Sequence, residues 1–171
     1  MESVLHWEPV LGGALAIGHR PKLKLMKNLK DAGATHVFTL LSAKEGAEQI
    51  GAAAQKAGLD WIWLPLAGAA PPGQARDEEI LTAFQSTRAA LASDAKIFLH
   101  CSAGIHRTGM MSYALLRILG ESPEAAREKL RALRQITGEG VGDHRLEWGD
   151  GFAARVAVQG PAGDSAHNES T

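Results

Sequence analysis

A cysteine and an arginine separated by five residues are the residues whose types and spacing best suit a chemical reaction. They lie in the segment His-Cys-Ser-Ala-Gly-Ile-His-Arg-Thr (100–108), which follows the apolar run Ile97-Phe98-Leu99 and precedes a helical pattern. A turn between a buried strand and a helix points backbone N–H groups inward, so it can cradle an anion and can also stabilise a thiolate. We therefore expect Cys101 to be a thiolate nucleophile at neutral pH.

Arg107 has the spacing that complements such a nucleophile. Five intervening residues allow a curled loop to return the guanidinium over the sulfur of Cys101. A guanidinium can bind two phosphate oxygens at once. The next residue, Thr108, carries a hydroxyl that could donate to the sulfur as it leaves phosphorus. The sequence thus predicts phosphate chemistry at this loop.

The same segment resembles the signature of the cysteine-dependent protein tyrosine and dual-specificity phosphatases. The resemblance implies that Cys101 attacks phosphorus, that Arg107 binds the equatorial oxygens, and that a phosphocysteine is hydrolysed in a second step. It also implies that His100 supports the thiolate and that Thr108 aids dephosphorylation. Backbone amides would line the substrate cradle at Ser102, Ala103, Gly104, Ile105, His106 and Arg107.

The resemblance extends from about Ala14 to about Trp148 and is closest to the short, kinase-associated-phosphatase-like kind. That kind has segments similar to Ala-Ile-Gly-His-Arg-Pro (16–21), to the stretch 29–41, and to Trp-Ile-Trp-Leu-Pro-Leu (61–66). The order of these matches along the chain supports the resemblance.

The expected general acid is missing from its usual place. In the resembled family an aspartate follows the proline by about three residues, but here that position is Gly68. The next acid is Asp77, with Glu78 and Glu79 beside it, and a helix start is a sufficient alternative reason for Asp77. A general acid typically contributes about 10²–10⁴-fold, and its loss is mildest for phenolic leaving groups. The sequence therefore favours phosphotyrosine over phosphoserine and offers Asp77 as the candidate acid.

Several other polar residues have a structural interpretation beside a functional one. His100 could be a satisfied core histidine, and His106 could face solvent rather than substrate. Arg20 could be a solvated charge. The segment 143–145, Asp-His-Arg, could be a charged helix start rather than a loop that positions water or substrate. Trp61 and Trp63 alternate along a strand and are expected in the core or its lining.

The elements around the loop alternate between short apolar runs and helical patterns. Predicted strands are Ala14–Gly18, Thr35–Leu41, Leu59–Leu64 and Lys96–His100. Predicted helices are Lys22–Ala32, Glu45–Ala57, Asp77–Leu91, a helix from Gly104 to Gly120, Ser122–Arg134 and one within Asp143–Val158. Residues 65–75 are predicted as a loop because they contain three prolines and two glycines. This pattern predicts a single α/β domain with a central, mainly parallel sheet flanked by helices, and the phosphate-binding loop between a strand and a helix.

Composition narrows the classes of partner and compartment. The 171 residues suit one domain, predicted as residues 1–158, followed by a flexible tail at 159–171. A net charge of −1 offers no surplus for nucleic acid or a membrane surface, and no run approaches the ~20 apolar residues of a bilayer span. The start of the chain resembles no secretory signal, and the one cysteine suits a reducing compartment, so a cytoplasmic location is expected. We also expect the protein to be a monomer.

These observations predict a phosphomonoester hydrolase without metal or organic cofactor. Its partners would be a phosphorylated protein or a small phosphomonoester, with phosphotyrosine-like groups favoured and phosphoserine or phosphothreonine also considered. Two alternatives remain at this point. One is a phosphate-binding module with weak turnover, suggested by Gly68, and the other is an inositol phosphate or phosphoinositide phosphatase.

Overall fold

The computed structural model describes residues 5–159, which form a five-stranded sheet between two layers of helices. The strands are β1 (Glu8–Val10), β2 (Gly13–Gly18), β3 (His36–Thr39), β4 (Asp60–Trp63) and β5 (Lys96–His100). Their order across the sheet is β1-β2-β5-β3-β4, with β1 antiparallel to β2 and the other neighbours parallel. The predicted fold class is confirmed.

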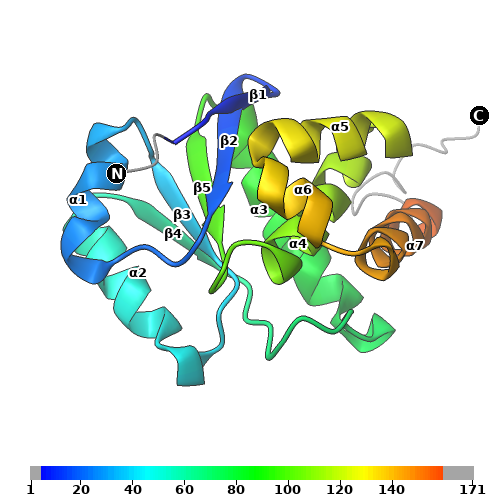
Figure 1. Cartoon of the computed structure of the whole chain (residues 1–171), viewed down its shortest axis with the longest axis horizontal. Coiled ribbons are helices and arrows are strands. Elements are labelled where there is room, and N and C mark those ends of the chain that lie inside the picture. Colours follow the sequence, from blue (N-terminus) through cyan, green and yellow to red (C-terminus); the bar gives the residue numbers. More distant parts are fainter. Residues whose placement is uncertain (1–4, 160–171) are drawn as a thin grey trace, which may run out of the picture.

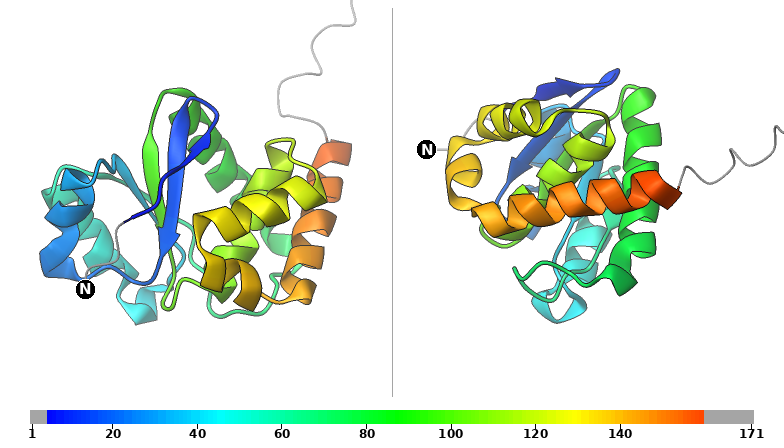
Figure 2. Two further views of the ribbon diagram at one scale, coloured as in Figure 1. Left: turned by 45° about the horizontal axis from the view of Figure 1, so that its top comes forward. Right: turned by 90° about the vertical axis from the view of Figure 1, so that its right-hand side faces the viewer.

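The helices divide between the two faces of the sheet. The helices α1 (Met26–Asp31) and α2 (Ala47–Lys56) cover one face. The other face carries α3 (Asp77–Ala92), α4 (His106–Ile118), α5 (Pro123–Leu133), α6 (Gln135–Gly140) and α7 (Asp143–Gln159) (Figure 1). The left view of Figure 2 shows the same separation into layers, and the right view looks onto the α7 side.

The core lies on both faces of the central strands, because each face must be covered for a parallel sheet to be stable. Val37, Phe38, Ile97 and Leu99 are all buried. On α4, the buried face extends from Arg107 to Leu116, so this helix lies deep in the domain. The end of β5 is therefore held between packed layers on both sides, which gives the following loop a rigid base.

Short 3-10 turns η1 (Leu23–Leu25), η2 (Ala43–Glu45) and η3 (Gln74–Arg76) precede three of the helices. The helix predicted from Lys22 thus begins as η1, and the helix predicted from Glu45 begins as η2, with the α-helix itself starting at Ala47. Gly46, with a φ of 88°, separates η2 from α2. The predicted tail at 159–171 is wrong at its first residue, because Gln159 ends α7, and the rest of it lies outside the described residues.

Candidate active site

The loop 101–105 joins β5 to α4 at the carboxyl end of the parallel strands. Gly104 has a φ of 74°, and a Cβ atom there would lie 2.2 Å from the carbonyl oxygen of Gly18. Glycine therefore permits both the left-handed backbone and the close approach to β2. The N–H of Arg20 donates to the carbonyl of Ser102 at 2.8 Å, which ties the loop to the end of β2 at a second point.

Side chains from α6 and its start hold further carbonyl groups of the loop. Arg134 Nη1 donates to the carbonyls of Ala103 and Gly104, at 3.0 and 3.1 Å, and Thr137 Oγ1 donates to that of Gly104 at 2.6 Å. In a planar trans peptide the N–H points opposite to the C=O. The amide groups that follow these carbonyls are therefore directed away from Arg134 and Thr137, as an anion cradle requires.

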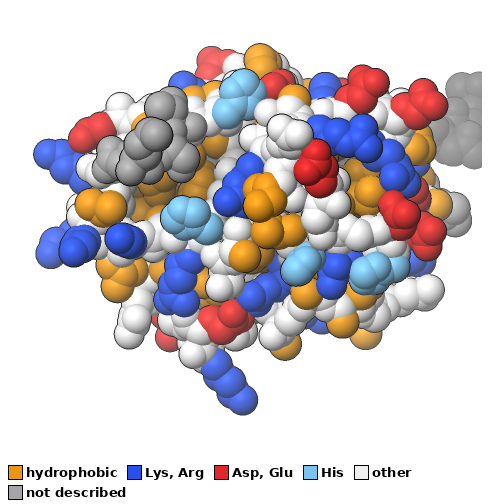
Figure 3. Space-filling view, viewed as in Figure 1, with side chains coloured by type: hydrophobic (Ala, Val, Ile, Leu, Met, Phe, Trp, Pro, Cys, Tyr) orange, Lys and Arg blue, Asp and Glu red, His pale blue; other side chains and the backbone are white. Residues whose placement is uncertain are grey.

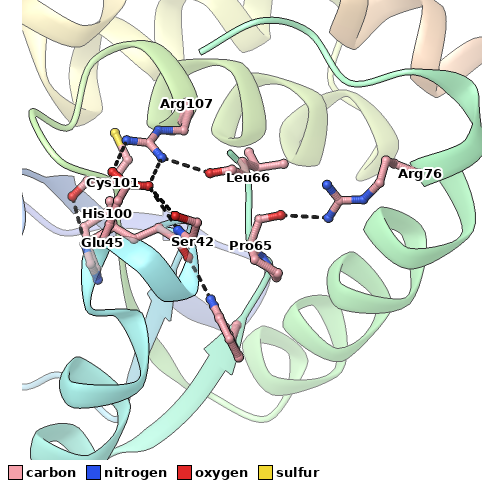
Figure 4. A network of polar contacts seen from close by, with 10 residues as sticks. Ser42, Glu45, Pro65, Leu66, Arg76, His100, Cys101 and Arg107 are labelled. Carbon is pink, nitrogen blue, oxygen red and sulfur yellow. Dashed lines mark hydrogen bonds and ion pairs between the residues drawn. The ribbon is translucent and has the colours of Figure 1, made fainter. Parts of the chain in front are cut away.

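Arg107 lies in the first turn of α4, and its guanidinium has two fixed partners. Nη1 and Nη2 donate end-on to the two carboxylate oxygens of Glu45, at 2.7 and 2.9 Å, and Nη1 also donates to the carbonyl of Leu66 at 2.9 Å. Figure 4 shows the guanidinium beside the sulfur of Cys101. A guanidinium has five N–H donors, so Nε–H and the second Nη2–H remain for another acceptor. These two donors form the edge that can bind two phosphate oxygens.

Glu45 is the site residue that the sequence prediction missed. Its carboxylate also accepts hydrogen bonds from the N–H and the hydroxyl of Ser42, at 3.1 and 3.0 Å, in a capping box at η2. The hydrogen bond from Arg107 lowers the pKa of Glu45 to about 2, and Glu45 in turn raises the pKa of Arg107. The Ser-x-x-Glu pattern at 42–45 was visible in the sequence as a helix-start signal. Its pairing with a residue 62 positions away was not.

We expect Glu45→Gln to lower kcat/KM by roughly tenfold or more, because Arg107 loses a charged acceptor that fixes its orientation.

The substitution should also change how the free energy of unfolding depends on pH. The pKa of Glu45 is lowered on folding from 4.5 to about 2, so its carboxylate stabilises the fold above pH 4.5 and loses this contribution as pH falls towards 2. The unfolding free energy of the wild type should therefore exceed that of Glu45→Gln at pH 7, and the difference should shrink across this window. A difference that is constant from pH 7 to pH 2 would contradict the ion pair.

His100 is fully buried at the end of β5 and both of its ring nitrogens have partners. Nε2 lies 2.8 Å from Thr39 Oγ1, and Nδ1 lies 3.0 Å from the carbonyl oxygen of Cys101. Burial lowers the pKa of His100 to about 4, so the ring is neutral at neutral pH. A neutral ring bonded to the backbone of Cys101 can orient the thiol-bearing residue without adding charge.

The other residues predicted at the loop occupy distinct environments. Cys101 is buried at the base of the loop, whereas Ser102, Ala103 and His106 are exposed at its surface. Thr108 Oγ1 is buried and has no hydrogen-bond partner among the described residues. Its hydroxyl is thus uncommitted, and its predicted donation to the sulfur stays a prediction.

The segment that crosses from β4 to η3 is held by its carbonyl groups. Besides the bond from Arg107 to Leu66, Arg76 donates to Pro65 at 2.7 Å, Arg145 to Ala69 at 2.7 Å and Trp148 to Pro72 at 3.0 Å. Gly68 lies in this tethered segment, is exposed, and has open space where a Cβ would stand. The segment is therefore anchored beside Arg107 but carries no acid at the position where the resemblance expects one.

Asp77 is engaged elsewhere in the structure. Its carboxylate, on the first turn of α3, accepts two hydrogen bonds from Arg155 of α7, at 2.7 and 3.1 Å. Glu79 pairs with Arg76 at 2.7 Å, and both side chains are partly exposed to solvent. The ion pair supplies a structural reason for an aspartate at position 77. Its catalytic role stays a prediction.

Comparison with known proteins agrees with this geometry. A family model described as "Polymorphic toxin system, DSP-PTPase phosphatase" matches residues 14–121, which include the loop, Glu45 and Arg107. The chain belongs to this family. It is a DSP-PTPase phosphatase, and the predicted resemblance to the cysteine-dependent phosphatases is confirmed. A comparison with curated proteins gives no match.

Solved structures of phosphatases share the fold of this DSP-PTPase phosphatase at low sequence identity. Kinase associated phosphatase (KAP) superposes with a TM-score of 0.73 at 19% identity, over 90% of this chain and 96% of that one. PTPMT1 in complex with PI(5)P gives 0.66 at 17% identity, over 91% and 99%. P. aeruginosa TpbA in complex with pTyr gives 0.57 at 18% identity, over 88% and 93%. The α/β architecture is thus that of the phosphatase family.

The remaining candidates lie at the edges of the site. His19 is exposed and Arg20 is half-buried at the end of β2. At the start of α7, Asp143 lies 3.7 Å from Arg127, and Arg145 bonds to the carbonyls of Ala69 and Val141. Arg145 therefore acts at least as a tether for the segment that carries Gly68.

Two further observations concern residues 5–159 as a whole. In this part of the chain no helix is long and apolar enough to cross a membrane. Nor does it bring together three or more His, Cys, Asp or Glu side chains in a group that could hold a metal ion.

Proposed function

We propose that this DSP-PTPase phosphatase hydrolyses phosphotyrosine-like monoesters through a phosphocysteine on Cys101. The observation that carries the proposal is the arrangement at the loop. Glu45 and the carbonyl of Leu66 fix the guanidinium of Arg107 beside the sulfur of Cys101, and the edge formed by Nε–H and the second Nη2–H stays free to bind an acceptor. That edge is suited to two oxygens of a phosphoryl group whose phosphorus faces the sulfur.

The proposed reaction has two displacements at phosphorus. In the first, the Cys101 thiolate donates an electron pair to phosphorus, the phosphorus–oxygen ester bond breaks, and the alcohol oxygen leaves with that bond's electrons and takes up a proton from solvent water. In the second, water attacks the phosphocysteine and releases a proton to solvent, the sulfur–phosphorus bond breaks with its electrons going to sulfur, and inorganic phosphate leaves. The thiolate is regenerated, so one water is consumed per ester. Thr108 would donate a hydrogen bond from its hydroxyl to the departing sulfur, and the amides of 102–107 would bind the phosphoryl oxygens.

The surface around the loop favours an anionic substrate. Exposed His19, Lys44 and His106 come from three segments that meet at the loop. In Figure 3 Lys, Arg and His side chains form a band across the lower half of this face, with fewer acidic side chains among them. The Lys and Arg side chains of this band attract phosphorylated substrates although the whole chain has a net charge of −1.

The preference for phosphotyrosine rests on the leaving group. Gly68 supplies no proton, and a phenolate leaves without one far more readily than an alkoxide does. Both TpbA, solved in complex with pTyr, and PTPMT1, solved in complex with PI(5)P, share the fold, so the preference rests on the leaving group and on the loop residues. The phosphoinositide alternative is weaker, because the loop residues 102–106 include no lysine or arginine for additional phosphates.

Leaving-group dependence tests this proposal. With wild-type protein we expect kcat/KM to fall steeply from nitrophenyl to phenyl to alkyl phosphates. Gly68→Asp should raise the rate on phenyl and alkyl phosphates by about 10²-fold, since a carboxyl group there can protonate the leaving oxygen. Gly73→Asp is the matched control, because Gly73 lies in the same segment with equally open space for a side chain.

Rates on the same series of phosphate esters test the role of Asp77. In place of the catalytic role expected from the sequence, we propose a structural role for Asp77, because its carboxylate is held by Arg155. Asp77→Asn should therefore change kcat less than threefold and should mainly lower the melting temperature. A shallow leaving-group dependence in the wild type, together with a loss of roughly 10²-fold or more in Asp77→Asn, would instead identify Asp77 as the general acid.

A further inference from the structure

A line of hydrogen bonds runs from the edge strand of the sheet to the backbone of Cys101. Trp61 Nε1 lies 2.9 Å from Thr39 Oγ1, Thr39 Oγ1 lies 2.8 Å from His100 Nε2, and His100 Nδ1 lies 3.0 Å from the carbonyl oxygen of Cys101. The line crosses β4, β3 and β5, which are neighbours in the sheet. Thr39 and His100 are fully buried, so water does not compete for these groups.

The two ends of this line determine the direction of every hydrogen bond in it. The indole Nε1–H of Trp61 can only donate, and the carbonyl of Cys101 can only accept. His100 must therefore donate from Nδ1, which leaves Nε2 of the neutral ring as an acceptor. Thr39 then donates its hydroxyl hydrogen to Nε2, and its oxygen accepts from Trp61. This is the single assignment in which every donor meets an acceptor.

We propose that Thr39 and Trp61 are positioning residues of the phosphatase reaction, which fix His100 in the Nδ1–H tautomer and thereby hold the carbonyl of Cys101 in place. The proposal rests on the proposed function of Cys101. Neither residue touches the phosphate, and both act through His100. In the other tautomer, a lone pair on Nδ1 would face the carbonyl oxygen of Cys101 at 3.0 Å, and this repulsion would disturb the base of the loop.

The Trp61 ring is held in position by close contacts with α2 and with Trp63. A Cβ atom on Gly51 of α2 would lie 2.5 Å from the Trp61 ring, so the helix approaches the indole at a glycine. The Trp61 and Trp63 rings stack, with centroids 5.3 Å apart. The two indoles have separate acceptors, because Trp63 Nε1 donates to the carbonyl of Leu41 at 2.8 Å. Trp63 therefore provides a matched control for Trp61.

The test combines the spectrum of His100 with steady-state rates. Nitrogen-15 NMR of the imidazole in the resting protein should show the Nδ1–H tautomer in the wild type. Thr39→Val and Trp61→Phe should shift the His100 nitrogen signals towards a mixture of tautomers, whereas Trp63→Phe should leave them unchanged. Both tryptophan variants lose an indole from the same stack, so general loosening of β4 would affect the two spectra alike and would overturn the proposal.

Rates on nitrophenyl phosphate give the second readout. Thr39→Val leaves His100 Nε2 without a donor and Trp61 Nε1–H without an acceptor, and should lower kcat by roughly tenfold with little change in KM. Trp61→Phe should lower kcat by a few-fold. Thr39→Ser keeps the hydroxyl and should retain kcat within threefold. A Thr39→Val variant with wild-type kcat and a wild-type His100 spectrum would overturn the proposal. If the wild type hydrolyses no phosphomonoester, the proposed function fails, while the spectra still decide whether Thr39 and Trp61 set the tautomer.

Discussion

Cys101→Ser should abolish turnover while leaving phosphate binding largely intact. A serine hydroxyl at this position has no neighbouring base to remove its proton, because His100 bonds to the backbone and to Thr39 rather than to the Cys101 side chain. We expect kcat on nitrophenyl phosphate to fall more than about 100-fold, to background.

Binding of inorganic phosphate to Cys101→Ser, measured by calorimetry, should remain close to that of the wild type. The amides of the loop and the free edge of Arg107 do not depend on the sulfur. Residual turnover above about 1% of wild type would show that Cys101 is not the sole nucleophile. Loss of phosphate binding together with turnover would indicate that the loop itself had collapsed.

Arg107→Lys should be nearly as damaging although it retains the positive charge. A lysine ammonium is a point charge that cannot bind Glu45 end-on and present a second, planar edge to phosphate. We expect kcat/KM to fall by about 10²–10³-fold, the usual cost of removing a donor aimed at transition-state charge. The loss should be far larger than that in Glu45→Gln, because Glu45 acts only through Arg107.

Arg117→Lys is the matched control for this substitution. Arg117 lies on the same helix, α4, and its guanidinium bonds to Asp150 at 2.8 Å and to the carbonyl of Glu121 at 2.7 Å. Its replacement should affect stability but leave kcat/KM near wild type. Equal losses of activity in the two variants would mean that Arg107 acts through the packing of α4 rather than through phosphate.

The loop could be predicted from the sequence because its determinants are local. A buried strand, a glycine turn, a helix start and the five-residue spacing all lie within residues 97–111. Such short-range patterns identify both the elements and the chemistry. The prediction of the α/β fold rested on the same kind of evidence, namely apolar runs alternating with helical periodicity.

Two elements escaped prediction for identifiable physical reasons. The edge strand β1 has three residues and contains Pro9, which interrupts a strand pattern because it lacks an N–H. The helix α6 contains Gly138 and Gly140, which disfavour a helix, and exposes Ile136. A Cβ on Gly138 would lie 2.6 Å from the Arg131 side chain, so close packing against α5 explains this glycine.

The partners of the loop could not be predicted because they come from distant parts of the chain. Glu45 reaches Arg107 across 62 positions, and Thr39 reaches His100 across 61. The helical pattern placed Glu45 at the start of a predicted helix, and alternation placed Trp61 in the core or its lining. Neither signal shows which side chain contacts Glu45 or Trp61, since that depends on the order of strands in the sheet.

The most direct test of the proposed mechanism is to trap the phosphorylated enzyme. The protein is mixed with an excess of nitrophenyl phosphate, quenched within the first turnover, and digested for mass spectrometry. The mechanism predicts a phosphoryl group on the peptide that contains Cys101, which is the only cysteine of the chain, and none in Cys101→Ser. Hydrolysis at the wild-type rate with no phosphorylated Cys101, or with phosphate on another residue, would contradict it.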